Sequence, residues 1–198
     1  VGRSTYNYIS SNIEFSNTFD KHYVYAIAGL AREGDNPSNF DQVTLASYFA
    51  KFSYVFDNKY LLESTVRADG SSKLGPGKKW GTFPSVAIGW NVHNEEFLKH
   101  VTFIDNFKLR ASYGLMGNNG NVDRYRYQSL IDGGNGVETT IGNPDITWET
   151  VKMVDIGADV RMFKNLGLTI DWFDKTTDNI LLTPPLSLSS GVNSLPVN

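Results

Sequence analysis

The side chains that could support catalysis are few in this chain and lie far apart. It contains three histidines, His22, His93 and His100, and no cysteine. A serine hydrolase needs a histidine base beside its nucleophile. The three histidines fall at predicted turns and share no obvious site with a serine. Without cysteine there is no thiol nucleophile, no cysteine-based zinc site and no disulfide scaffold. We therefore predict no catalytic residues and expect that the chain is not an enzyme.

Acidic residues at short spacings are the next candidates, because carboxylates can ligate metal ions. The pairs in question are Asp155 with Asp159 and Glu63 with Asp69. Arg67 and Arg161 are interleaved with these carboxylates, so we interpret the groups as ion pairs. We predict no metal site and no cofactor. The glycine- and lysine-rich stretch Gly70–Lys79 lacks the Gly-Lys-Ser/Thr ending and the following helix of a phosphate-binding loop, and we expect a flexible surface loop there.

Aromatic and arginine side chains in the predicted long loops are candidates for binding. Trp80 and Trp148 border such loops and could stack on sugar rings, although anchoring at a membrane interface is the favoured interpretation. Four further candidates lie deep within a loop, where no interface requires aromatic residues: Arg124, Tyr125, Arg126 and Tyr127. Tyrosine and arginine are common binding anchors, so we predict that these four contact a ligand or a partner protein.

The elements that carry these residues show strict alternation of apolar and polar side chains. Leu62, Ser64 and Val66 alternate with Glu63, Thr65 and Arg67, and similar patterns recur along the chain. Since successive side chains of a strand point to opposite faces, each such strand has one apolar and one charged face. The pattern predicts a transmembrane β-barrel, with lipid outside and water inside. The segment from His22 cannot be oriented, because its two faces are equally apolar.

This pattern assigns specific residues to each side of the predicted barrel wall. We expect lipid to contact Leu62, Val66, Val86, Ile88 and Trp90. The predicted lumen-facing residues are Lys51, Glu63, Arg67, Asp69, Lys108, Arg110, Asp155, Asp159, Arg161, Asp171 and Lys175. A charge facing lipid at the midplane costs about 2–4 kcal/mol, so this segregation is not expected by chance.

Eight strands are predicted, and their connections alternate in length. The predicted strands are Tyr6–Phe19, His22–Arg32, Thr44–Phe56, Tyr60–Asp69, Gly81–Asn91, Phe107–Gly117, Val151–Phe163 and Leu166–Thr177. Tight polar turns join alternate pairs, whereas long loops at Glu33–Val43, Gly70–Trp80 and Gly117–Thr150 join the others. The exception is Val92–Asn106 on the short-turn side, where we expect a helical turn near Asn94–Lys99. Short turns at one end and long loops at the other are typical of outer-membrane barrels.

Several of these segments resemble one family in the right order. Arg67–Gly75 followed by Trp80–Ser85 resembles the signature hairpin of SusC/RagA-type TonB-linked outer-membrane transporters of Bacteroidetes. Later segments are similar to that family's later strands and a loop: Leu109–Gly114, Asn143–Glu149, Gly157–Phe163, Leu166–Trp172 and Thr176–Leu181. The resemblance extends over nearly the whole chain from about His22.

The resemblance implies an all-β fold, an antiparallel transmembrane β-barrel segment of about eight strands from a 22-stranded barrel. Residues 1–198 would then be part of a TonB-dependent receptor β-barrel domain, with the plug and TonB box outside this chain. It also implies import of glycans, or of peptides, across the bacterial outer membrane. The implied partners are a SusD-like surface lipoprotein, the TonB–ExbB–ExbD complex acting through the N-terminal parts, and outer-membrane lipid. Both ends of the sequence look cut, and we expect an interior piece of a larger polypeptide.

Two alternatives remain open at this point. One is a self-contained outer-membrane protein that acts as an adhesin or structural barrel. The other is a soluble carbohydrate-binding β-sandwich, because alternation alone does not distinguish lipid from a protein core. The net charge of −3 argues against a nucleic-acid partner.

Overall fold

A computed structural model shows eight long β-strands and little helix. It describes residues 5–36, 42–120, 122–131, 134, 138–182, 184 and 197. The long strands are β1 (Thr5–Phe19), β2 (His22–Asn36), β3 (Val43–Phe56), β4 (Tyr60–Ser71), β5 (Trp80–Asn91), β6 (Ile104–Asn118), β9 (Glu149–Met162) and β10 (Leu166–Asp178). All eight predicted strands are therefore confirmed. The long β6–β9 loop adds two short strands, β7 (Leu130–Ile131) and β8 (Glu138–Thr140), which pair with each other.

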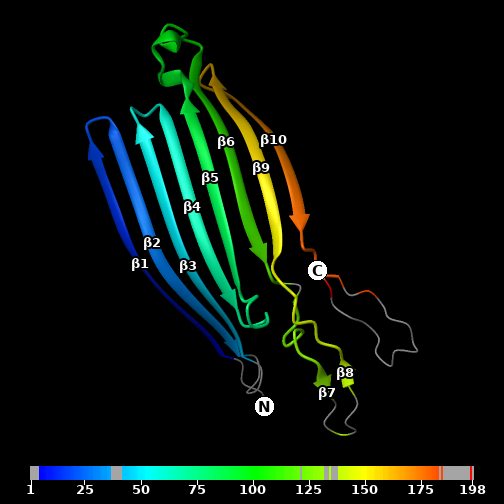
Figure 1. The fold of residues 1–198 in the computed structure, drawn as a ribbon. Coiled ribbons are helices and arrows are strands. Elements are labelled where there is room, and N and C mark those ends of the chain that lie inside the picture. Colours follow the sequence, from blue (N-terminus) through cyan, green and yellow to red (C-terminus); the bar gives the residue numbers. More distant parts are fainter. Residues whose placement is uncertain are drawn as a thin grey trace.

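The eight long strands form one antiparallel sheet in chain order, β1-β2-β3-β4-β5-β6-β9-β10. Each strand pairs with the next, as in an up-and-down barrel wall. Within the described residues β1 and β10 each pair on one side, so the sheet is curved but open (Figure 1). The predicted antiparallel barrel segment is confirmed, and its eight strands do not close into a barrel.

Short and long connections lie at opposite ends of the sheet (Figure 1). At the short-turn end, left-handed backbone at Asp20, Asp57 and Asn58 supports tight hairpins. The predicted helical turn is present there as two 3-10 turns, η1 (Val92–Asn94) and η2 (Glu96–Leu98). Parts of the predicted long loops, and the chain's last residues, lie outside the described residues. No helix in the described part of the chain is long and apolar enough to cross a membrane.

The strand register decides which side chains share a face, because residues directly opposite each other project to the same side. One row reads Val24, Tyr54, Leu62, Ile88, Ala111, Ile156 and Trp172 across the strands from β2 to β10. We call this side the apolar face. The register also orients β2, which the sequence could not: Ala26 lies opposite Phe52 on the apolar face, and Ile27 lies opposite Lys51 on the other.

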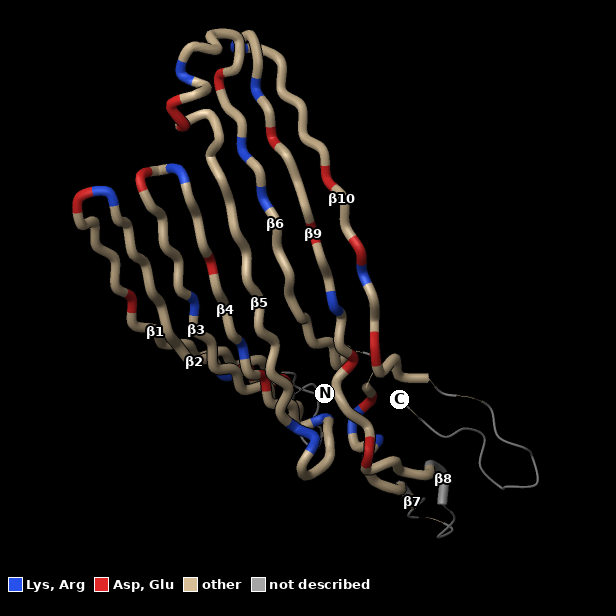
Figure 2. Tube along the Cα trace, turned by 45° about the horizontal axis from the view of Figure 1, so that its top comes forward, with Lys and Arg blue, Asp and Glu red and all other residues tan. Residues whose placement is uncertain are grey.

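The opposite side carries the charges predicted for a lumen, and we call it the charged face. The register places Ser53 opposite Glu63, Lys108 opposite Asp159, and Arg110 opposite Gly157 on this side. Figure 2 shows charged residues spaced along β6, β9 and β10. On β1 to β3 the charged face is more mixed, since Tyr25 and Ile27 lie among its polar residues.

A row of aromatic rings crosses the apolar face at the short-turn end. The ring of Phe56 lies 4.9 Å from His22 and 6.3 Å from Tyr60, whose ring lies 6.5 Å from Trp90. The Glu95 carboxylate accepts hydrogen bonds from the Tyr60 hydroxyl (2.7 Å), Lys59 Nζ (3.0 Å) and Trp90 Nε1 (3.1 Å). These hydrogen bonds hold the pKa of Glu95 below its usual range, and the bond from Tyr60 has the largest effect. The carboxylate therefore ties the 3-10 turns to the aromatic row.

The buried hydrophobic cluster lies at the long-loop end rather than within the sheet. Its members are Leu74, Phe83, Val122, Ile146 and Trp148, contributed by β5 and by the long loops. Pairing between β5 and β6 stops at Ser85 and Gly114 on this side, so the cluster packs where the ladder between these strands ends. Gly70–Lys79, where we expected a flexible surface loop, contributes to this cluster, because Leu74 is fully buried.

Candidate ligand-contact site on the charged face

The middle of the charged face is organised around one guanidinium group. Arg110 Nη1 lies 3.0 Å from Asp155 Oδ1, and Nε lies 3.2 Å from Asp159 Oδ2. Its Nη2 pairs with Asp171 on the next strand. Arg110 reaches Asp171 across Gly157, where an added Cβ would lie 2.6 Å from Arg110 Cζ. Four of the predicted lumen-facing residues are thus brought together in one cross-strand cluster.

Two smaller ion pairs lie on the same face. Lys51 Nζ lies 2.9 Å from Glu63 Oε2 across β3 and β4. Arg67 Nε lies 2.8 Å from Asp69 Oδ2 along β4, and Arg67 Nη2 donates to Ser47 Oγ at 3.0 Å. The carboxylates here are paired with cations, as the sequence led us to expect. Among the described residues, no group of three or more His, Cys, Asp or Glu side chains is arranged to hold a metal ion.

The remaining predicted lumen residues share this face by register. Lys108 lies opposite Asp159, Arg161 opposite Gly167, and Lys175 opposite Met153. The face therefore carries both signs of charge along the strands from β3 to β10. Such a surface suits hydration and contact with a polar solute, whereas an ion-selective pore uses a ring of one sign.

The two tryptophans singled out from the sequence have different surroundings. The Trp148 ring is buried against Phe83 at 5.5 Å, and its Nε1 donates to the Lys79 carbonyl at 3.0 Å. With 5% of its surface exposed, this ring supports the loops and presents no free face for a sugar. Trp80 lies over Gly70 on the apolar face and stacks on Tyr48 at 5.6 Å. This position fits an anchor at a membrane interface, the role that the sequence favoured over stacking on a sugar ring.

The four loop candidates form a turn that packs against the neighbouring loops. Arg124 Nη2 lies 3.8 Å from Asp35 Oδ2 of β2, whereas Arg126 Nε bonds Asp123 Oδ2 at 3.0 Å within the turn. Tyr125 has left-handed backbone, and the Tyr127 Cβ lies near Gly75. Of these four, Arg124 is the residue that joins the loop to the strand end.

Arg124 also lines a hollow of about 510 Å³ at the long-loop end of the charged face. Its lining from the strands is Glu33, Asp35, Val43, Leu45 and Ser71. Its lining from the loops is Lys73, Asn119, Gly120, Val122, Asp123 and Arg124. Carboxylates and cations face one space here, so a polar ligand could both donate and accept hydrogen bonds.

Sequence reasoning missed the strand side of this hollow. Tyr8 lies opposite Glu33, and Tyr6 lies opposite Asp35, so two exposed rings flank its acidic edge. Tyr6 and Tyr8 stand on alternate positions of β1, which is the spacing of one face. That signal was present in the sequence, but it could not be used because β2 beside it was not oriented.

The comparisons with known proteins agree with this architecture. The family model described as TonB dependent receptor-like, beta-barrel matches residues 1–198. TonB-dependent receptor P39 of Formosa agariphila is 32% identical over 209 residues, which cover 100% of this chain and 20% of that protein. TonB-dependent receptor SusC of Bacteroides thetaiotaomicron is 32% identical over 166 residues, covering 76% of this chain and 16% of that protein. The chain thus spans about a fifth of the length of these relatives.

Solved structures show the same fold at lower sequence identity. The structure of the RagAB peptide transporter aligns with a TM-score of 0.88 and 22% identity, over 98% of this chain and 26% of that one. The siderophore receptor PirA from Pseudomonas aeruginosa aligns with a TM-score of 0.61 and 13% identity, over 98% of this chain and 36% of that one. At these identities the likeness establishes the fold alone.

Proposed function

Because the chain belongs to the TonB-dependent receptor β-barrel family, we propose that it forms part of the wall of an outer-membrane transporter for a bulky polar nutrient. The family consists of receptors and transporters rather than enzymes, and we propose no catalytic role for this chain. A glycan is the first candidate for the cargo and a peptide the second.

The observation that carries the proposal is the separation of the two faces of the sheet. Leu62, Ile88 and Ile156 share one face, whereas Arg110 and its three carboxylate partners lie on the other. In a bilayer the apolar face contacts lipid and the charged face contacts a hydrated lumen. The long loops then lie outside the cell and the short turns in the periplasm, the arrangement of bacterial barrels of this kind.

The rest of the transporter is proposed from the relatives and the family resemblance. Residues 1–198 supply about eight strands of a 22-stranded barrel. A barrel of that size encloses a lumen wide enough for a plug domain. The plug and the TonB box lie elsewhere in the longer protein, and the TonB–ExbB–ExbD complex supplies the energy. A SusD-like lipoprotein covers the long-loop end, and the hollow beside Arg124 and Lys73 provides ligand or partner contact there.

The membrane arrangement can be tested with single cysteines placed in this chain, which has none of its own, within the full-length protein after any cysteine elsewhere in it is replaced by serine. A membrane-impermeant maleimide should label Glu63→Cys and Arg67→Cys faster than Leu62→Cys and Val66→Cys. Fast labelling at Leu62 and Val66, with protection at Glu63 and Arg67, would contradict the proposed faces. Extraction of the protein without detergent would instead support a soluble carbohydrate-binding sandwich.

Transport can be tested by growth of a gene deletion strain on a panel of glycans and peptides. We expect a growth defect on one class of polymer, with the same defect when TonB energisation is blocked. If no polymer requires the gene and TonB loss changes no uptake, the transporter proposal fails. An adhesin or structural barrel would then be the better interpretation.

A further inference from the structure

Charged residues on the apolar face gather at the long-loop end. They are Arg32 on β2, Lys152 on β9, and Asp174 and Asp178 on β10. Lys152 Nζ pairs with Asp178 Oδ2 at 2.5 Å. Arg32 is exposed and has no hydrogen bond or ion pair within the described part of the chain. A guanidinium on the apolar face with no partner among the described residues requires an explanation.

The height of Arg32 on the sheet corresponds to a membrane boundary. Ten residues separate it from His22 in the aromatic row, and ten separate Trp80 from Trp90 on β5. At about 3.4 Å per residue and a tilt of about 40°, this spacing is ~26 Å, close to the lipid-facing band of a barrel, about 25 Å. A guanidinium is strongly disfavoured at the midplane and tolerated at the interface, so this position can face lipid headgroups.

Arg32 stands in a hollow of about 200 Å³ that also has three polar side chains and one apolar side chain in its lining. The lining residues are Asn7, Ile9, Arg32, Gly34, Gln42 and Thr44. A Cβ added at Gly34 would meet nothing within 4 Å, so no described atom fills the space over this glycine. Amide and hydroxyl groups around an arginine that has no partner among the described residues suit a phosphate, because arginine binds phosphate oxygens through two parallel N–H bonds.

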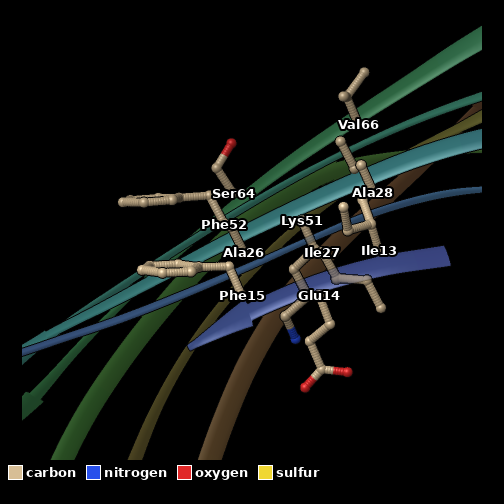
Figure 3. Close-up of a pocket in the computed structure, with 11 residues that line it drawn as sticks. Ile13, Glu14, Phe15, Ala26, Ile27, Ala28, Lys51, Phe52, Ser64 and Val66 are labelled. Atoms are coloured by element: carbon tan, nitrogen blue, oxygen red, sulfur yellow. The ribbon is translucent and has the colours of Figure 1, made fainter. Parts of the chain in front are cut away.

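Below this hollow, the same face of β1 to β4 carries an apolar groove of about 450 Å³. Its floor consists of Ala26, Ala28 and Ala50. Phe15 and Phe52 flank Ala26 directly, and Ile13 and Val66 bound the two alanines in the next row. Figure 3 shows the rings of Phe15 and Phe52 on one side of the sheet, with Glu14 and Lys51 directed to the other. Exposed Leu30 and Tyr48 lie on the same face between the hollow and the groove. A phosphate-sized hollow with an apolar groove further down the same face matches a headgroup with an acyl chain.

We infer that Arg32 and the groove below it form a binding site for one phosphorylated lipid of the outer leaflet. The guanidinium pairs with the headgroup phosphate, and an acyl chain lies over the alanine floor between the two phenylalanines. This inference rests on the proposed function, since the apolar face must contact lipid and the long loops must lie outside.

The test uses native mass spectrometry of the full-length transporter in mild detergent, titrated with bisphosphorylated lipid A and with its dephosphorylated form. The Arg32→Gln variant should bind the phosphorylated lipid about tenfold more weakly, which corresponds to about 1.4 kcal/mol for a charge-assisted pair. Arg32→Lys should recover most of the loss. Lys51→Gln, which removes a charge from the other face of the neighbouring strand, should bind like the unaltered protein.

A second variant tests the groove while leaving the charge in place. Ala28→Phe fills the alanine floor and should also weaken binding of the phosphorylated lipid, whereas a site for free phosphate would be unaffected by it. Unchanged binding in Arg32→Gln, equal binding of the dephosphorylated lipid, or unchanged binding in Ala28→Phe would overturn the inference. Heat-modifiable migration on a gel checks that each variant is folded. The maleimide labelling at Leu62 and Val66 separates the two failures, because it reports the orientation of the faces without reference to Arg32.

Discussion

The two ends of the sheet are stabilised in different ways. At the short-turn end, tight hairpins hold the strands together, and the Glu95 carboxylate joins the 3-10 turns to a row of rings on the apolar face. At the long-loop end, side chains from loops distant in sequence bury one another, with Ile146 fully enclosed and Trp148 nearly so. Contacts between the strands and their adjacent turns hold the first end, whereas the second has a small hydrophobic core of its own.

This difference indicates where the protein can vary its function. Loops that carry their own core can change their outer residues without disturbing the barrel wall, and binding residues are commonly found on loops held by a rigid scaffold. The hollow beside Arg124 lies against this core, since Val122 belongs to both. Changes at the two ends should therefore have separable effects on ligand binding and on barrel stability.

The largest effect is expected when the loop core is opened. Trp148→Ala removes the ring against Phe83 and the hydrogen bond to Lys79, and such truncations cost about 3–5 kcal/mol at buried sites. Trypsin should then cleave faster after Lys73, Lys78 and Lys79, while the barrel keeps its heat-modifiable migration. Trp80→Ala, at the same end on the apolar face, is the matched control. If Trp148→Ala also unfolds the barrel, the two ends are not independent.

A smaller effect is expected in the wall between the ends. Gly157→Ala places a Cβ within 2.6 Å of Arg110 Cζ and displaces the guanidinium from its three carboxylates. Because these groups are partly exposed, we expect only a modest loss of barrel stability, measured by urea unfolding in detergent. Gly167→Ala, where an added Cβ meets nothing within 4 Å, should change little. Equal effects at both positions would remove the role given to the Arg110 cluster.

Ligand binding should depend on the long-loop end alone. Arg124→Ala should weaken binding of the glycan or peptide identified by the growth panel about three- to tenfold, measured by calorimetry on the full-length protein. Arg126→Ala is the comparison, because its guanidinium does not itself line the hollow but bonds Asp123, which does, so we expect a smaller loss. Barrel stability should remain unchanged in both variants. A larger loss for Arg126→Ala would move the ligand contact away from the hollow.

The smallest effect is expected at the short-turn end, and it depends on pH. Hydrogen bonds to the carboxylate lower the pKa of Glu95 in the folded protein, so its contribution to stability is present above about pH 4.5, the ordinary value for a glutamate. That contribution is lost as the pH falls through the lowered folded-state pKa. Glu95→Gln should therefore lower the melting temperature at pH 7, and the difference from the unaltered protein should shrink at pH 3.

Glu96→Gln is the control for this measurement, because Glu96 bonds only the exposed Lys99 among the contacts described for it. Exposed pairs of this kind contribute little to stability. The difference in melting temperature between Glu95→Gln and the unaltered protein should change with pH. If it does not, the carboxylate charge is not what joins the 3-10 turns to the aromatic row.

The sequence by itself determined the number of long strands, their approximate limits, the faces of most of them and the family. These properties depend on alternation, which is local: neighbouring side chains of a strand point to opposite sides whatever the rest of the chain does. Leu62 and Glu63 lie on opposite faces of the sheet for this reason. For β2 both faces are apolar, so local alternation had no contrast to use, and only the register with Phe52 and Lys51 oriented the strand.

Only the tertiary structure decided which loop residues are buried and which are presented. Trp80 and Trp148 look alike in the sequence, each beside a long loop, but one lies on the apolar face and the other is enclosed by the loop core. The same holds for the hollow, where Asp35 and Arg124 are brought together from segments 89 residues apart, and for the acidic cluster around Arg110. Contacts of this kind depend on how loops and strands distant in sequence pack against one another, and residue spacing carries no information about that packing.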